Sequence, residues 1–220
     1  MSGSAPHPVF VSGSLLGRGL FDGQVDRFEG ATFLESIDRG SSVGLAEWLA
    51  DELVTTPSPR AVIGHGLGAV GALQLSTARP ELIDGLMLIG IGAQTWVPTA
   101  GDLRERIVEA AFTDPASPEA RKTHDALAAT ESSVLEEALH TWAAVDLGGR
   151  LRAVGQPTRV VAAGGVERAA GVGAEALARE GWGAGVGGWP SAGGASPAGG
   201  AGAVGVLGGA WLARVELRRA

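Results

Sequence analysis

The sequence predicts an α/β protein: an open, mostly parallel sheet with helices on both faces and a helical insertion in the middle of the chain. Short runs rich in Val and Ile alternate with stretches of helical periodicity, which is typical of strands joined by helices. The run at 84–92 is almost wholly apolar, as expected of a parallel strand buried on both faces. With 220 residues and 45% hydrophobic content, the chain can bury the core of one domain.

Strands are expected where a short apolar run is bounded by turn residues. The segments of this kind are 8–13, 31–40, 57–65, 84–92 and 156–165, with a weaker candidate at 183–190. Helical periodicity follows the second and third of these strands. Ser42 is expected to cap the first of the two helices, whose apolar face comprises Leu45, Trp48, Leu49 and Leu53. The second helix, 66–79, ends before Pro80 and is expected to bury Val70, Leu73 and Leu75.

The segment 93–150 is polar and helical in pattern, and no buried strand can be found in it. We therefore predict that residues 1–92 and 151–220 form the α/β core and that residues 93–150 form a helical cap, or lid. Two more helices are expected at 174–180 and 197–217. Glycine makes up 36 of the 220 residues, and six glycines fall in the last helix. Each costs about 1 kcal/mol relative to alanine, so this helix is expected to be weak.

Composition and charge exclude several classes of protein. A net charge of −7 and a pI near 5.1 argue against nucleic-acid binding, which needs clustered Lys and Arg. The chain has no cysteine and no recognisable signal peptide at its start. The uncharged stretch 181–213 is broken by Gly, Pro and Ser, and its longest apolar run, 201–213, is shorter than the ~20 residues of a membrane span. We predict a cytoplasmic protein that binds a small molecule, with no nucleic-acid or membrane partner.

The segment 62–73, VIGHGLGAVGAL, is an apolar run that stops at a glycine and restarts as a small-residue helix. It resembles the pattern G-x-S-x-G, in which a strained strand-to-helix turn exposes a serine nucleophile. Other segments follow in the order found in the α/β-hydrolase family: VFVSGS for the oxyanion strand, SIDRGSS, LRAVGQPTRVVAAGGVER and GWPSAGGASP. The chain resembles this family over nearly its whole length. The resemblance implies an ester or lactone hydrolase scaffold that lacks the family's first two strands.

The resemblance also implies site residues, and two of them cannot do the chemistry. Gly66 stands at the nucleophile position and Gly194 at that of the histidine base, while Glu167 stands at the position of the acid. The backbones of Ser14 and Leu67 would form the oxyanion hole, with Ser12, Gly13 and Leu15 beside the substrate. Removing the serine or the histidine from a triad typically costs about 10⁶ in rate. The resemblance therefore implies a protein that is crippled or inactive in ordinary acyl transfer.

Each of these residues also has a structural interpretation. Gly66 is either an emptied elbow or only the tight turn that a helix packed on a strand requires. His65 is either a displaced base or a buried structural histidine. Glu167 is either a retained acid or a solvated loop residue, and Ser12 either contacts a ligand carbonyl or caps the end of its strand.

Three functions remain open at this point. The chain is an inactive hydrolase relative, a non-catalytic binder of a carbonyl-bearing molecule, or a nucleophile-free enzyme that uses His65 or Glu167 for proton transfer. No cofactor is expected, because GHGLGAVG departs from G-x-G-x-x-G and a phosphate-binding G-x-x-x-x-G-K-[ST] loop is absent. The four histidines lack metal-ligand spacing, so no metal site is expected.

Overall fold

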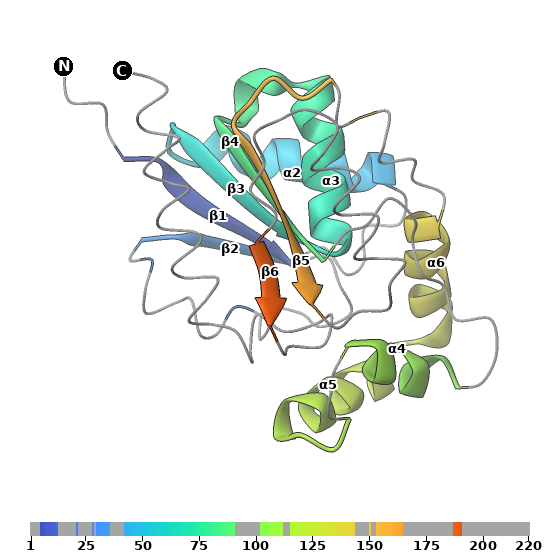
Figure 1. The fold of residues 1–220 in the computed structure, drawn as a ribbon. Helices are drawn as coiled ribbons and strands as arrows, with labels where there is room; N and C mark the ends of the chain where they lie inside the picture. Colours follow the sequence, from blue (N-terminus) through green and yellow to red (C-terminus); the bar gives the residue numbers. More distant parts are fainter. Residues whose placement is uncertain are drawn as a thin grey trace.

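The protein folds around a six-stranded sheet in the order β2-β1-β3-β4-β5-β6 (Figure 1). The computed structural model describes residues 5–12, 21, 28, 30–35, 42–90, 102–111, 115–143, 150, 153–164 and 187–190. The strands are β1 His7–Ser12, β2 Thr32–Glu35, β3 Arg60–His65, β4 Gly85–Ile89, β5 Thr158–Gly164 and β6 Gly187–Pro190. Every pairing between neighbouring strands is parallel, which confirms the predicted fold class. The weak candidate at 183–190 is confirmed as the edge strand β6.

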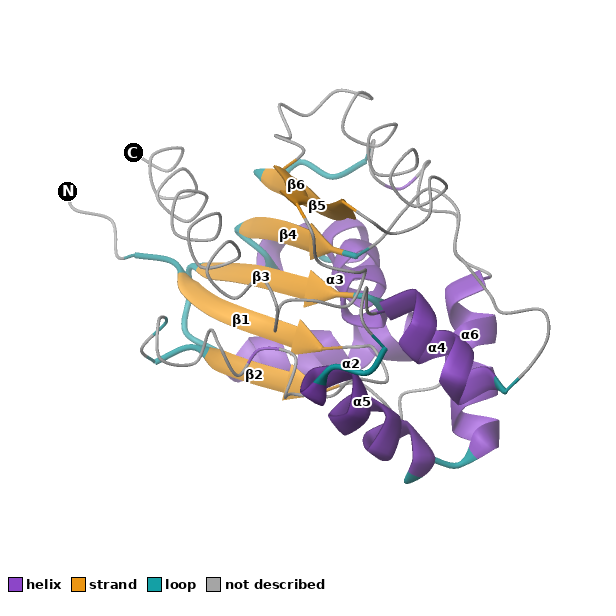
Figure 2. Cartoon of the chain, turned by 60° about the horizontal axis from the view of Figure 1, so that its bottom comes forward, coloured by secondary structure: helices purple, strands orange, loops and turns teal. Residues whose placement is uncertain are grey.

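Two helices cover one face of the sheet (Figure 2). They are α2, Ser42–Thr55, and α3, Leu67–Ala78, and the short 3-10 helix η2, Pro80–Leu82, follows α3. Ser42 is the first residue of α2, so the predicted cap position was one residue off. The helices expected at 174–180 and 197–217 lie outside the described residues.

The core has a layer on each face of the sheet, because side chains alternate along each strand. On the face covered by α2 and α3, the core includes Val9, Leu49, Leu53, Leu73 and Leu86. The predicted inward residues of both helices are buried, except Trp48, which is half-buried against this layer.

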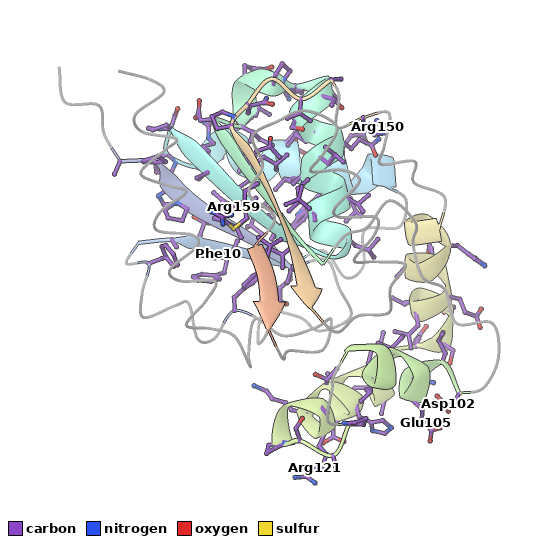
Figure 3. All side chains as sticks on the ribbon, in the orientation of Figure 1. Phe10, Asp102, Glu105, Arg121, Arg150 and Arg159 are labelled. Atoms are coloured by element: carbon purple, nitrogen blue, oxygen red, sulfur yellow. The ribbon has the colours of Figure 1, made fainter. Side chains whose placement is uncertain are left out.

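The layer on the opposite face is aromatic. Phe10 stacks on Phe33 with ring centroids 4.9 Å apart, and it also contacts Phe21 and Phe28 at 5.1 and 5.3 Å. Figure 3 places Phe10 on this sheet, where Ile63 and Met87 of the neighbouring strands complete the layer. Burial on both faces explains why β4 is apolar along its whole length.

The amino end of the sheet is held by polar contacts. Asp84 accepts a hydrogen bond from the backbone N–H of Arg60 at 2.7 Å. His7 Nε2 lies 2.9 Å from Thr32 Oγ1, and partial burial lowers the pKa of His7. The side chain of Gln156 donates to the carbonyls of Ser76 and Pro80, which ties the start of β5 to the end of α3. These contacts lie at the end of the sheet opposite the turn at Gly66.

In the described part of the predicted helical segment lie the helices α4 Leu103–Ala111, α5 Pro118–Ala128 and α6 Ser132–Ala143. No strand occurs in the described part of residues 93–150. Ser117 caps α5 by accepting a hydrogen bond from the N–H of Ala120, with Pro118 at the first position of the helix. Figure 2 shows the three helices beyond the carboxyl ends of the strands. Among the described residues, no helix is long and apolar enough to cross a membrane.

Candidate active site

The turn between β3 and α3 is sharp, and its centre is Gly66. Gly66 has φ 55° and ψ −123°, a left-handed conformation that side-chain-bearing residues rarely adopt. Its N–H donates to the carbonyl of Ile89 at 3.0 Å. Its own carbonyl accepts from the N–H groups of Ala69 and Val70 at 3.0 and 3.2 Å. The chain therefore changes from strand to helix at one residue, held between β4 and the first turn of α3.

Gly64 lets α3 begin directly on top of β3. A Cβ atom at this position would lie 2.6 Å from the Cα of Ala69 and 2.7 Å from the carbonyl oxygen of Gly68. Both contacts are with backbone, which cannot move aside without displacing the helix. The first glycine of GHGLG is thus required by the close approach of helix and strand. Together, Gly64 and Gly66 give this segment a sharp strand-to-helix turn with no side chain at its centre.

The first turn of α3 points backbone N–H groups away from the helix. The N–H groups of Ala69 and Val70 bond to Gly66, whereas those of Leu67 and Gly68 have no acceptor within the helix. Gly66 has no side chain to cap them. Such a helix end carries a partial positive charge and favours an electron-rich oxygen.

Ser12 and His65 are neighbours at the carboxyl ends of β1 and β3. They are partners in the parallel register, and their side chains are 1% and 4% exposed. Strand alternation places both on the face that carries Phe10 and Ile63, opposite α3. Ser12 Oγ donates to the carbonyl of Leu34 at 3.3 Å. The structural interpretation of Ser12 is therefore supported, and His65 lies on the sheet face away from the helix.

The remaining predicted site residues lie outside the described residues. They are Gly13, Ser14, Leu15, Glu167 and Gly194. The structure therefore brings together Ser12, His65, Gly66 and Leu67 at the carboxyl edge of the sheet and does not test the other positions. His7 lies at the start of β1, at the opposite end of the sheet, and His124 and His140 are exposed on α5 and α6. Within the described ranges, no group of three His, Cys, Asp or Glu side chains could hold a metal ion.

The first residue of α3 shares an apolar cluster with the helices α4, α5 and α6. The side chain of Leu67 is 4% exposed and belongs to an apolar cluster with Leu45 of α2. The other buried members of this cluster come from α4, α5 and α6: Val108, Ala120, Leu127, Leu135 and Ala138. The sequence predicts a site role only for the backbone of Leu67. Its place in this cluster cannot be predicted, because residues so far apart in the chain share no periodic pattern.

Comparison with known proteins identifies the fold of this chain through its structure and not through its sequence. No protein-family model matches the sequence, and no curated protein matches it. Solved structures do match: an enol-lactonase from Burkholderia xenovorans LB400 has a TM-score of 0.81 at 16% identity, over 96% of this chain and 92% of the other.

Two further structures agree with the first. A thermophilic esterase has a TM-score of 0.81 at 18% identity, covering 97% and 92% of the two chains. A hydrolase from Pseudomonas aeruginosa PA01 has a TM-score of 0.78 at 19% identity, covering 96% and 91%. The chain therefore has the α/β-hydrolase fold, as its resemblance to that family implied. Its scaffold is like that of ester hydrolases.

Proposed function

We propose that this protein is a hydrolase-fold protein without a nucleophile, which does not carry out ordinary acyl transfer. The observation that carries the proposal is Gly66, which occupies a sharp strand-to-helix turn at φ 55° and has no side chain. In acyl-transfer enzymes of this fold, the residue at this turn supplies the hydroxyl that attacks the substrate carbonyl. Without that oxygen, no acyl-enzyme can form at the turn.

The positions proposed for the acid and the base follow the last two strands. Glu167 comes three residues after the end of β5, and Gly194 comes four residues after the end of β6. Because β5 and β6 are adjacent and parallel, both segments leave the sheet at its carboxyl edge, which supports assigning them to one site. A glycine at 194 cannot accept the proton that a nucleophile releases. The base is then missing as well as the nucleophile.

Activity against a simple ester tests this proposal. The wild-type protein should hydrolyse p-nitrophenyl acetate no faster than an equal concentration of a Gly64→Ala variant in the same buffer. Turnover above that background by the wild-type chain, saturable in substrate, would contradict the proposal.

A second candidate function is non-catalytic binding of a small carbonyl compound, such as an ester or a lactone. It is favoured by the N–H groups of Leu67 and Gly68, which have no acceptor within α3. We propose that the backbone N–H groups of Leu67 and Ser14 donate hydrogen bonds to the carbonyl oxygen of this compound. The helices α4, α5 and α6, which lie beyond the strand ends and share an apolar cluster with Leu67, would form the cap of the site.

Thermal-shift measurements distinguish a protein that binds such a ligand from one that no longer binds any. A ligand at 100 times its Kd stabilises the folded state by about 2.7 kcal/mol. Small esters, lactones and the matching carboxylic acids are the set to screen. A binder must show a concentration-dependent rise in Tm with at least one of them, and no rise with any would remove the binding hypothesis while leaving the missing nucleophile unaffected.

A further inference from the structure

The three helices of segment 103–143 are joined by one arginine. Arg104, in the first turn of α4, donates from Nε to the carbonyl of Leu127 at 2.9 Å. Its Nη2 donates to the carbonyl of Thr130 at 2.8 Å and to Ser132 Oγ at 3.2 Å. These acceptors lie at the end of α5, in the following turn and at the start of α6. A single planar guanidinium therefore connects all three helices, which lysine could not do with the same geometry.

The position of Arg104 is itself held by a helix cap. Asp102 Oδ1 accepts hydrogen bonds from the N–H groups of Arg104 and Glu105 at 2.8 and 3.4 Å. Figure 3 shows Asp102 and Glu105 together at the start of α4. The positive charge of Arg104 also meets the negative end of the α5 dipole, which favours this contact.

The same helices supply apolar side chains to the cluster that includes Leu67. Val108 follows Arg104 by one helical turn, so the two side chains lie on neighbouring parts of α4. Leu127 gives its carbonyl to Arg104 and its buried side chain to the cluster around Leu67. Leu135 follows Ser132 by three residues and belongs to the same cluster. The hydrogen bonds of Arg104 thus connect the three helices whose apolar side chains share a cluster with Leu67, the first residue of α3.

We propose that Arg104 is a positioning residue for the turn at Gly66. It locks α4, α5 and α6 into one unit, which packs on Leu67 and fixes the first turn of α3. The orientation of the Leu67 and Gly68 N–H groups then depends on a side chain in a different part of the fold. This coupling between Arg104 and the N–H groups of Leu67 and Gly68 needs no ligand. Only its effect on ligand binding rests on the proposed function.

Amide NMR of the intact chain tests the coupling. Arg104→Gln should shift the Leu67 and Gly68 amide resonances, and it should speed hydrogen exchange in 103–143 by about tenfold or more. Arg121→Gln is the matched control, since it removes the same charge from an exposed side chain on α5 (Figure 3). Arg104→Lys keeps the charge but not the planar guanidinium that bonds several acceptors at once, so its resonances and exchange rates should resemble those of Arg104→Gln. The proposal is overturned if Arg104→Gln leaves the Leu67 and Gly68 resonances as unchanged as Arg121→Gln does.

A second variant approaches the same contact from the α3 side, in case Arg104→Gln does not fold. Leu67→Ala should speed exchange in 103–143, whereas Leu73→Ala, in the core layer on the other side of α3, should not do so selectively. Unchanged exchange in 103–143 in Leu67→Ala would also overturn the proposal.

Binding adds a third readout. If γ-butyrolactone shifts the wild-type resonances on titration, Arg104→Gln should weaken its Kd severalfold and Arg121→Gln should not, and equal weakening by both would count against the coupling. Failure of the wild-type protein to bind esters or lactones would contradict the binding function alone, because the resonance and exchange effects are measured without ligand.

Discussion

The Cα of Ala69 lies 2.6 Å from the point where a side chain on Gly64 would begin. Helix α3 is therefore in direct contact with the backbone of β3, and the turn at Gly66 has no room to widen. This contact makes the strand-to-helix junction rigid whether or not it carries a nucleophile. Several consequences for stability can be measured directly.

Gly64→Ala should destabilise the protein. The new methyl group meets only backbone atoms, so the start of α3 must move. Overpacking of this kind costs about 1–3 kcal/mol, measured as the free energy of unfolding in urea. Gly155→Ala is the control, because a Cβ there has nothing within 4 Å. A Gly64→Ala variant as stable as Gly155→Ala would show that α3 does not lie on β3 in this way.

Gly66→Ala should also destabilise, for a different reason. Its cost comes from the left-handed backbone conformation, φ 55°. Such strain amounts to about 1–3 kcal/mol at one residue. Urea unfolding measures it, and Gly155→Ala again serves as control. An increase in stability would mean that residue 66 relaxes to an ordinary helical or extended conformation.

Gln156→Ala should loosen the amino end of the sheet. The substitution removes two hydrogen bonds and leaves the Ser76 and Pro80 carbonyls without these donors. The expected loss is about 2 kcal/mol in the free energy of unfolding. Gln74→Ala is a matched control, because no hydrogen-bond partner is found for its Oε1 among the described residues. Equal effects from both substitutions would contradict the role given to Gln156.

His7 should make stability depend on pH. Burial lowers the pKa of His7 below 6.5 in the folded protein, so His7 takes up a proton at a higher pH in the unfolded chain than in the folded one. The stability that His7 contributes is therefore complete above pH 6.5 and falls as the pH drops from there to its folded pKa. The difference in unfolding free energy between wild type and His7→Asn should favour wild type more at pH 7.5 than at pH 5.5. A difference that is the same at both pH values would contradict this.

Most of the fold could be predicted because its signals are local. The apolar run at 84–92 has the composition of a buried parallel strand, and β4 lies at the centre of the sheet. The spacing of Leu45, Leu49 and Leu53 identifies the inward face of α2. Helix ends are harder to predict, as Ser42 shows, because the same residue types occur as the capping residue and as the first helical residue.

The candidate site could be predicted only in part. The pattern GHGLG indicates the turn because Gly64 and Gly66 each meet a backbone requirement that glycine alone satisfies easily. Nothing in the sequence indicates that Arg104 binds the carbonyls of Leu127 and Thr130. Backbone carbonyls are present at every residue, so their partners depend on the tertiary fold and leave no motif.

We propose that the turn at Gly66 could expose a serine nucleophile and lacks only the side chain that would act as one. Restoring the missing groups tests this most directly, with Gly66→Ser and Gly194→His combined in one chain. A fluorophosphonate probe should label residue 66 of the folded double variant stoichiometrically, while wild type and Gly194→His alone stay unlabelled. Labelling of a serine in the wild-type chain, or a folded double variant that is not labelled, would contradict it.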